Sequence, residues 1–295
     1  MRQLDVAVVV RTNELRHGVA RAFDRAPAQW NVTLHRDPPP DANVVIAERG
    51  CVARADVWLA PDNLDGIVDA VAAVIDHHAG RVIGFVGTGG GVGVTSVALH
   101  VAAAMRSECC LIDLDERARG VGLRLGLPAT TPSWADLEDQ PESLLQCALP
   151  VAGGFRVLLG PTDGPSIVPH EAFAIAGARF EQVLVDVAGQ DLGDVLARCR
   201  LAVLVTTPTL PSMGRAKQLV DIVEDVPVAI VTNRLGPGSD ATRSALEAEL
   251  GRRIALQLPC SAMLRDREDQ AALLKTPFSR WYRGIQRLAR TIENQ

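Results

Sequence analysis

The segment from Val82 to Ser96, VIGFVGTGGGVGVTS, has the residue types and spacing of a phosphate-binding loop. An apolar run leads into five glycines within seven residues, followed by a hydroxyl pair and an alanine-rich stretch. Glycines let the backbone turn so that successive N–H groups face an anion, and the N-terminus of a following helix adds partial positive charge. The predicted loop residues are Gly89, Gly90, Gly91, Val92, Gly93, Val94, Thr95 and Ser96. The alternative is a strand-to-helix turn that binds no ligand.

Carboxylates follow two further apolar runs. Asp113 and Asp115 come directly after one run, and Asp186 ends another. Carboxylates just past a buried strand, beside a phosphate loop, can hold Mg²⁺ or orient a water molecule. The Thr95 hydroxyl stands where such a loop ligates Mg²⁺. We expect Mg²⁺ at Thr95, Asp113 and Asp186, and any hydrolysis to depend on Asp115 and Asp186. The alternative for the first two carboxylates is capping of the next segment.

A side-chain amide follows a later apolar run. The run Val228–Asn233 ends in Thr232-Asn233-Arg234, where Asn233 could bind a purine edge. The alternative is a simple turn residue, because Asn is common after strands. We include Asn233 and Arg234 in the predicted site, and its expected cofactor is ATP or ADP with Mg²⁺.

The elements that would position these residues fall into two units, 1–78 and 82–295, joined by a linker at 79–81. In the first unit we predict strands at Asp5–Val10, Asn31–His35, Ala42–Ala47 and Val57–Ala60, and helices at Glu14–Phe23 and Asn63–Ile75. In the second we predict strands at Val82–Val86, Cys109–Leu114, Phe155–Leu159, Gln182–Val187, Ala202–Thr206, Val228–Thr232 and Ile254–Leu258. Helical patterns lie at Thr95–Met105, His170–Gly177, Gly193–Cys199, Met213–Val223 and Ser239–Glu249. This alternation predicts an α/β fold with a doubly wound, mostly parallel sheet and its ligand at the carboxyl ends of the strands.

Composition excludes some classes of function. Hydrophobic residues make up 47% of the chain and aromatics 4%, which suits buried strands of Val, Leu and Ile. The net charge is −5 with no basic block, so no nucleic-acid surface is expected. Of the 30 basic residues only Lys217 and Lys275 are lysines, so the predicted loop has none.

The order of the motifs resembles the MinD/ParA family. GGGVGVTS at Gly89–Ser96 is similar to its deviant Walker A motif KGGxGKTT, and DLD, LVDVAG, LVTTPTLPSMGRAKQL and VTNR follow in the family's order. A narrower resemblance is to the CpaE/TadZ branch and its actinobacterial septum-site-determining (Ssd) relatives, through Trp134-Ala135-Asp136-Leu137 and the unit that precedes the loop. It covers residues 81–280 and, more loosely, 1–78.

The resemblance implies roles and also shows departures. It places the phosphate-binding backbone on Gly90–Thr95, and the family's two loop lysines fall on Gly89 and Val94. Because a lysine between the β- and γ-phosphates stabilises charge that develops during transfer, we expect no hydrolysis or very slow hydrolysis. A substitute arginine, Arg117 or Arg119, would instead permit an active ATPase.

The first unit resembles a receiver domain that has lost its acidic pocket. Arg11–Asn13 stand where paired carboxylates belong, Ala47 and Glu48 at the phosphoacceptor position, and Ala60 at the lysine position. We therefore expect a truncated pseudo-receiver that docks partner proteins and accepts no phosphoryl group.

Pro277–Glu293 is predicted to be an amphipathic helix. Its apolar stripe comprises Phe278, Trp281, Tyr282, Ile285, Leu288, Ala289 and Ile292, and its basic face comprises Arg280, Arg283, Arg287 and Arg290. We favour packing of this stripe against the sheet, and the alternative is a helix lying in a membrane interface.

Together these features predict a cytoplasmic, homodimeric, nucleotide-responsive scaffold, placed at a pole or at the inner face of the cell membrane. By resemblance it would position a Tad-type pilus assembly machine or a division site, with pilus-assembly or division proteins as partners. The alternatives are an active P-loop ATPase and a scaffold that binds no nucleotide.

Overall fold

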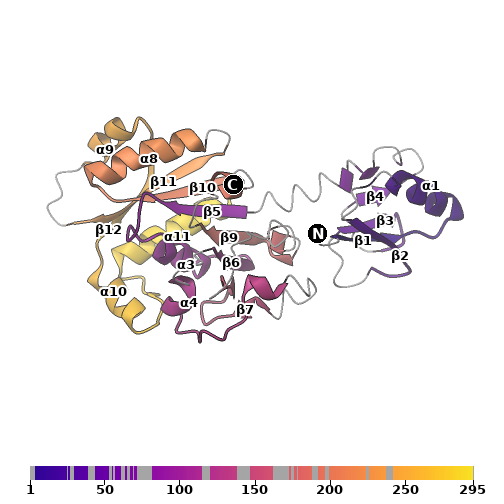
Figure 1. Ribbon diagram of the computed structural model, residues 1–295, viewed down its shortest axis with the longest axis horizontal. Coiled ribbons are helices and arrows are strands. Elements are labelled where there is room, and N and C mark those ends of the chain that lie inside the picture. The colour runs from indigo at the N-terminus through magenta and orange to yellow at the C-terminus, as the bar shows by residue number, and fades with distance from the viewer. Residues whose placement is uncertain are drawn as a thin grey trace.

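The computed structural model contains two parallel sheets, one in each predicted unit (Figure 1). It describes residues 4–24, 26, 30–38, 44–52, 55, 57–60, 64, 67–68, 70–71, 82–114, 120–137, 147–161, 173, 176–177, 179–187, 192–196, 199–223, 226–236 and 242–294. The predicted linker at 79–81 lies outside these residues, as does most of the helix predicted at 63–75.

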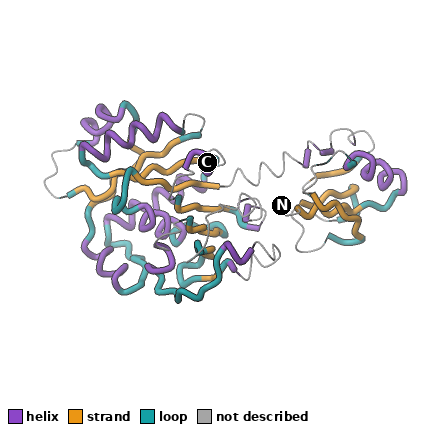
Figure 2. The backbone as a smooth tube through the Cα atoms, in the orientation of Figure 1, coloured by secondary structure: helices purple, strands orange, loops and turns teal. Residues whose placement is uncertain are grey.

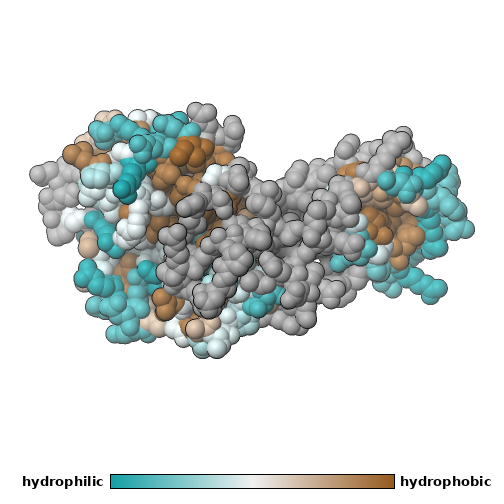
Figure 3. Space-filling model, viewed as in Figure 1, coloured by the Kyte–Doolittle hydropathy of each residue, from teal (hydrophilic) through white to brown (hydrophobic). Residues whose placement is uncertain are grey.

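The smaller sheet has four parallel strands in the order β2-β1-β3-β4. They are β1 (Leu4–Val9), β2 (Trp30–His35), β3 (Val44–Glu48) and β4 (Val57–Leu59), with helix α1 (Asn13–Phe23) between the first two. All four predicted strands are confirmed. Helix α1 turns Leu15 and Val19 into the apolar core, and its outer surface is hydrophilic in Figure 3.

The larger sheet has eight strands in the order β12-β11-β10-β5-β9-β6-β8-β7. Its strands are β5 (Val82–Gly87), β6 (Cys109–Asp113), β7 (Leu149–Pro150), β8 (Arg156–Leu158), β9 (Gln182–Asp186), β10 (Leu201–Thr206), β11 (Val228–Leu235) and β12 (Ile254–Pro259). Every pair is parallel except β7 with β8, so the predicted mostly parallel α/β sheet is confirmed.

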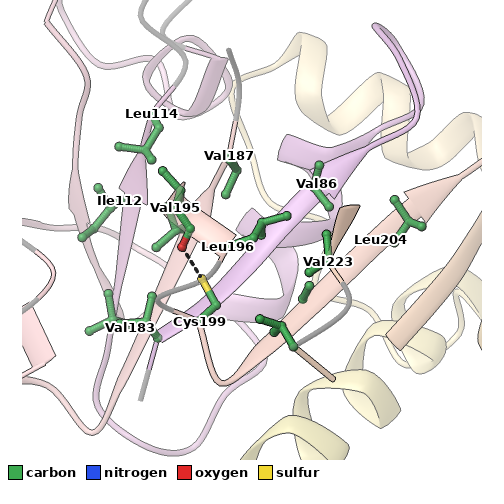
Figure 4. Close-up of a cluster of buried hydrophobic side chains, with 14 of the residues drawn as sticks. Val86, Ile112, Leu114, Val183, Val187, Val195, Leu196, Cys199, Leu204 and Val223 are labelled. Carbon is green, nitrogen blue, oxygen red and sulfur yellow. Dashed lines mark hydrogen bonds between the residues drawn. The ribbon is translucent and has the colours of Figure 1, made fainter. Parts of the chain in front are cut away.

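Helices cover both faces of this sheet (Figures 1 and 2). They are α3 (Val94–Ala102), α4 (Gly120–Arg124), α7 (Leu192–Leu196), α8 (Leu210–Ile222), α9 (Arg243–Leu250), α10 (Ala262–Asp269) and α11 (Arg280–Glu293), and η2 (Trp134–Leu137) is a 3₁₀ helix. Side chains alternate along each strand between two apolar clusters. Val86 and Leu204 face the cluster drawn in Figure 4, and Phe85 and Val203 face the cluster beneath α3 and α11.

Helix α11 packs into the core of the larger sheet, as favoured from the sequence. Seven of its residues are buried, namely Trp281, Tyr282, Gly284, Ile285, Leu288, Ala289 and Ile292. The predicted start was wrong, because the helix begins after Ser279, whose hydroxyl accepts from the N–H of Tyr282 at 3.3 Å. Phe278 therefore precedes the helix and is 88% exposed, so it does not belong to the apolar stripe.

Other differences are small. Helix α7 comprises Leu192–Leu196, residues 197 and 198 lie outside the described residues, and Cys199, the predicted end, is not helical. Most of the helix predicted at 170–177 also lies outside the described residues. The sequence analysis missed α4, α10 and the short edge strand β7. Within the described part of the chain, no helix combines the length and apolar character needed to cross a bilayer.

Candidate functional site

The predicted phosphate loop lies at the carboxyl end of β5, which is a central strand of the larger sheet. Gly91 and Gly93 have φ values of 77° and 98°, in the left-handed region that favours glycine. Among the described residues, no backbone carbonyl accepts from the N–H groups of Gly89 to Gly91 or of Gly93 to Ser96, while Gly90 and Gly91 form a hydrogen-bonded turn. Because backbone N–H groups need acceptors, this segment offers a set of donors to an anion.

A cavity of about 390 Å³ opens over this loop. All eight predicted loop residues line it, together with Val86, Gly87, Arg124, Asp186, Val187, Leu192, Arg234 and Glu268. The sheet thus brings the loop, Asp186 and Arg234 together, as the sequence predicts. Sequence analysis missed Arg124 and Glu268 because α4 and α10, which supply them, were not predicted.

The two carboxylates at the strand ends are neighbours. Asp113 of β6 pairs in register with Asp186 of β9, and both are buried, at 0% and 3% exposure. Asp186 lines the cavity, whereas Asp113 Oδ2 accepts from the N–H of Val121 at 3.1 Å and does not line it. Asp115 lies outside the described residues, as do Arg117 and Arg119.

The cavity contains oxygen donors suited to Mg²⁺. Thr95, at the start of α3, and Asp186 supply a hydroxyl and a carboxylate, which are the donor types that this hard cation prefers. Bound phosphate oxygens complete such a site in nucleotide-binding proteins. Thr95 and Asp186 therefore fit a magnesium ion that is held jointly with a nucleotide.

Asn233 supports the loop from behind. Its Nδ2 donates to the carbonyl oxygen of Val92 at 2.9 Å, and its Oδ1 accepts from Trp281 Nε1 at 3.3 Å. The residue is 3% exposed and packs against Gly93, where a Cβ atom would collide with the amide. Asn233 is not part of the cavity lining, whereas the next residue, Arg234, lines the cavity.

His100 of α3 is a second buried brace, which the sequence analysis missed. Its Nδ1 lies 2.7 Å from the carbonyl oxygen of Ser96, and its Nε2 accepts from the N–H of Leu274 at 3.0 Å. These partners require a neutral ring with the proton on Nδ1. Burial lowers the pKa of His100 to about 4, against the smaller opposing effect of the bond to Ser96. The only sequence signal was one polar residue in an apolar helix.

Trp134 and Asp136, in the Trp-x-Asp-Leu element, also have structural contacts. Trp134 Nε1 donates to the carbonyl oxygen of Asp113 at 3.1 Å, and the backbone N–H of Trp134 donates to the carbonyl oxygen of Leu159 at 2.8 Å. Asp136 accepts from the N–H of Ser133 at 2.6 Å, which caps the 3₁₀ helix η2. The element therefore fixes the end of β6 beside the cavity.

The positions of the family's two loop lysines have different surroundings. At Val94, the side chain leans back over Gly87 at the end of β5. At Gly89, an added Cβ atom would lie 2.9 Å from Arg215 Nη1, and this guanidinium also donates to the carbonyl oxygen of Thr88 at 3.4 Å. No pattern in the sequence predicts this approach of α8 to the loop.

In the first unit, the side chain of Glu48 connects the end of β3 to the residues that follow β1. Its Oε2 accepts from the N–H groups of Arg11 at 2.9 Å and Thr12 at 3.2 Å. These are the positions where the receiver resemblance places the acidic pocket. The carboxylate here is bound by the chain's own backbone.

In sequence, the chain matches no family model and no curated protein. In structure, it is similar to a ParA family ATPase from Chlorobium tepidum, with a TM-score of 0.62 and 23% identity over 72% of this chain and 98% of that one. It is also similar to the cell division ATPase MinD of Pyrococcus furiosus, with a TM-score of 0.62 and 20% identity over 73% and 99% of the two chains. MinD of Pyrococcus horikoshii, solved with Mg-ADP, has a TM-score of 0.60 and 18% identity over 72% and 95%. At these identities the comparisons establish the α/β fold that MinD and ParA ATPases share.

Proposed function

We propose that this chain is a nucleotide-responsive localisation scaffold with a degenerate ATP site, of the kind found in the CpaE/TadZ branch of the MinD/ParA superfamily. The observation that supports this most is a loop that keeps its left-handed glycines, and in which most N–H groups have no backbone acceptor among the described residues, but that has Gly89 and Val94 at the two lysine positions. The glycine backbone that can bind phosphates is kept, whereas the lysines that also stabilise the charge developing during transfer are absent.

Different residues would bind the phosphates, the Mg²⁺ ion and the rest of the nucleotide. The N–H groups of Gly90 to Thr95 and the N-terminus of α3 hold the phosphates. Thr95 and Asp186 hold Mg²⁺, which neutralises phosphate charge when it is bound. Arg234 lies at the rim of the cavity, where it meets the rest of the nucleotide.

Hydrolysis would be slow for an electrostatic reason. Phosphoryl transfer spreads negative charge over the transferred group, and a loop lysine normally stabilises it. Removing one such stabilising group typically costs on the order of 10² to 10³ in rate. Neither Gly89 nor Val94 carries the positive charge of a lysine. The site therefore suits a protein that responds to its bound nucleotide better than a fast ATPase.

A homodimer that closes over the cavity fits the surface around it. Leu123 of α4 is 69% exposed and Leu210 of α8 is 79% exposed, and each belongs to an element whose arginine approaches the cavity or its loop. Burying these two leucines between subunits would stabilise a dimer by removing apolar surface from water. We propose a second copy of this chain as the occupant, which would make assembly only modestly sensitive to ATP.

The first unit would serve as the docking module. Its Glu48 carboxylate is already bound to two backbone N–H groups, so this edge suits a fixed surface better than a phosphoryl switch. Pilus-assembly or division proteins are the partners we propose. The scaffold would then mark a pole or a division site from the cytoplasmic side.

Calorimetric titration of the purified protein with ATP and with ADP, each with Mg²⁺, together with a phosphate-release assay, tests this proposal. We expect weak binding of both nucleotides and negligible turnover. Turnover near that of an ordinary P-loop ATPase, abolished by Asp186→Ala, would establish the active-enzyme alternative. No binding of either nucleotide at millimolar concentration would establish the nucleotide-free alternative.

A further inference from the structure

We propose that Arg215 of α8 binds phosphate from outside the loop and so takes over the phosphate-binding part of the role of the lysines that the loop lacks. This inference rests on the proposed function, because it assigns a ligand-binding residue to the same site. It concerns the phosphate chain of a nucleotide rather than the base.

The first observation is a steric match between two positions. Arg215 Nη1 lies 2.9 Å from the point where a Cβ atom of residue 89 would stand. Real Cβ atoms essentially never come so close to another heavy atom. Gly89 therefore leaves room for the guanidinium, and any side chain at position 89 would push it away. The position that lacks a lysine is the position that an arginine approaches.

The second observation is that α8 and the loop are held by the same buried network. The N–H of Thr88 donates to the carbonyl oxygen of Val205 at 3.1 Å, and its hydroxyl donates to Thr206 Oγ1 at 3.3 Å. Both threonines are buried, and β10 leads through residues 207–209 into α8. The start of the loop and the start of α8 are thus fixed to each other, which sets where Arg215 can reach.

The third observation concerns charge. Lys217, on the same helix, pairs with Glu249 at 3.0 Å, and Arg124 at the cavity pairs with Glu268 at 3.5 Å. Within the described part of the chain, no carboxylate forms a salt bridge with Arg215, and its guanidinium donates to the Thr88 carbonyl oxygen. A guanidinium presents a planar fork of donors that matches phosphate oxygens. Arg215 is therefore available to an anion bound in the loop.

Calorimetric titration of ATP with Mg²⁺ into four proteins tests the assignment. Relative to wild type, Arg215→Ala should weaken binding about tenfold, as expected for a charge-assisted hydrogen bond. Arg215→Lys should lose less, because it keeps the charge without the fork. The matched control is Lys217→Ala, which removes the same charge from the same helix and should bind as wild type does.

Gly89→Ala separates a phosphate-binding role from a merely structural one. The added methyl group meets the end of a flexible side chain, so the melting temperature should stay near that of wild type while ATP binding falls. In an Arg215→Ala background the same change should have little further effect, because the group it displaces is already absent.

Equal ATP binding by wild type and Arg215→Ala would overturn the inference and leave the proposed function standing. Fully additive losses from Gly89→Ala and Arg215→Ala would also overturn it. If wild type binds neither ATP nor ADP, the inference and the proposed function both fail.

Discussion

Trp281 Nε1 donates to Asn233 Oδ1 at 3.3 Å, and this bond joins helix α11 to the strand behind the phosphate loop. The other end of the same amide donates to the carbonyl oxygen of Val92. One buried side chain therefore transmits the position of α11 to the loop. The shape of the ligand site depends on packing at the far end of the sequence.

Asn233→Ala should destabilise the larger unit by about 2 to 3 kcal/mol, because it leaves the Trp281 N–H and the Val92 carbonyl without their partner. Trp281→Phe should cost less, since it removes only one of the two bonds. Urea unfolding followed by far-ultraviolet circular dichroism measures both. An Asn233→Ala protein as stable as wild type would contradict the bracing role.

The free energy of unfolding should decrease as the pH is lowered, because His100 then becomes protonated in the unfolded chain. Its pKa is about 4 in the folded protein and 6.5 in the unfolded chain, so the unfolded chain binds more protons between these values. The contribution is fully present above pH 6.5 and is lost as pH falls toward 4, by about 3 kcal/mol in all. Urea midpoints at pH 7.5 and 4.5 measure it. His100→Leu should be less stable at pH 7.5 but show a shallower decline, and an unchanged pH slope would refute the assignment.

Val94→Lys should raise ATP turnover at least tenfold, because it returns a cation to the loop where charge develops during transfer. The wild-type side chain is only partly buried and leans over Gly87, so a longer chain has an outlet toward the cavity. Phosphate release measures the change. Val94→Met is the control for length without charge, and a gain shared by Val94→Met would show that charge is not the cause.

Gly93→Ala should abolish nucleotide binding. The residue has a φ of 98°, and an added Cβ atom would strike the Asn233 amide, so the loop must change shape. The left-handed conformation alone costs an alanine about 1 to 2 kcal/mol. Gly154→Ala is the matched control, because φ is 85° there and nothing lies within 4 Å of the added atom. It should lose only the stability that the left-handed conformation costs, and it should keep nucleotide binding, as measured by calorimetry.

Removal of residues 277–295 should give an insoluble or non-cooperatively melting protein. Helix α11 buries Trp281 and Ile285 in the core, so its loss exposes the sheet face and α3. Circular dichroism melting and co-sedimentation with anionic liposomes separate this from the membrane interpretation. A truncated chain that melts cooperatively and loses only liposome binding would favour a membrane role for the helix.

The sheet could be predicted from the sequence because its long strands are continuous apolar runs. The alternation of such runs with helical patterns specifies a parallel arrangement, and the glycine positions specify the loop. The start of α11 was misplaced because Phe278 continues the apolar spacing, although Ser279 caps the helix. Periodicity alone does not detect a cap of this kind.

Only those residues of the candidate site that stand at the ends of strands could be predicted from the sequence. Asp186 and Arg234 stand directly after apolar runs, so their convergence on one edge could be expected. Arg215 and Glu268 lie in the middle of polar helical segments, where a charged residue ordinarily faces solvent. Their positions near the loop depend on how α8 and α10 pack in the folded domain, and spacing along a single helix does not encode that packing.

The bond between Asn233 and Trp281 also has a consequence for biosynthesis. A ribosome makes the phosphate loop long before it makes α11, and domains of this size fold largely as units. Until α11 emerges, the Asn233 amide lacks one partner and the apolar face of α3 stays uncovered. A nascent chain would therefore expose the apolar face of α3 and an incompletely supported anion site at the same time. A nascent chain without α11 should therefore bind nucleotide poorly, because Trp281 does not yet hold Asn233 behind the loop.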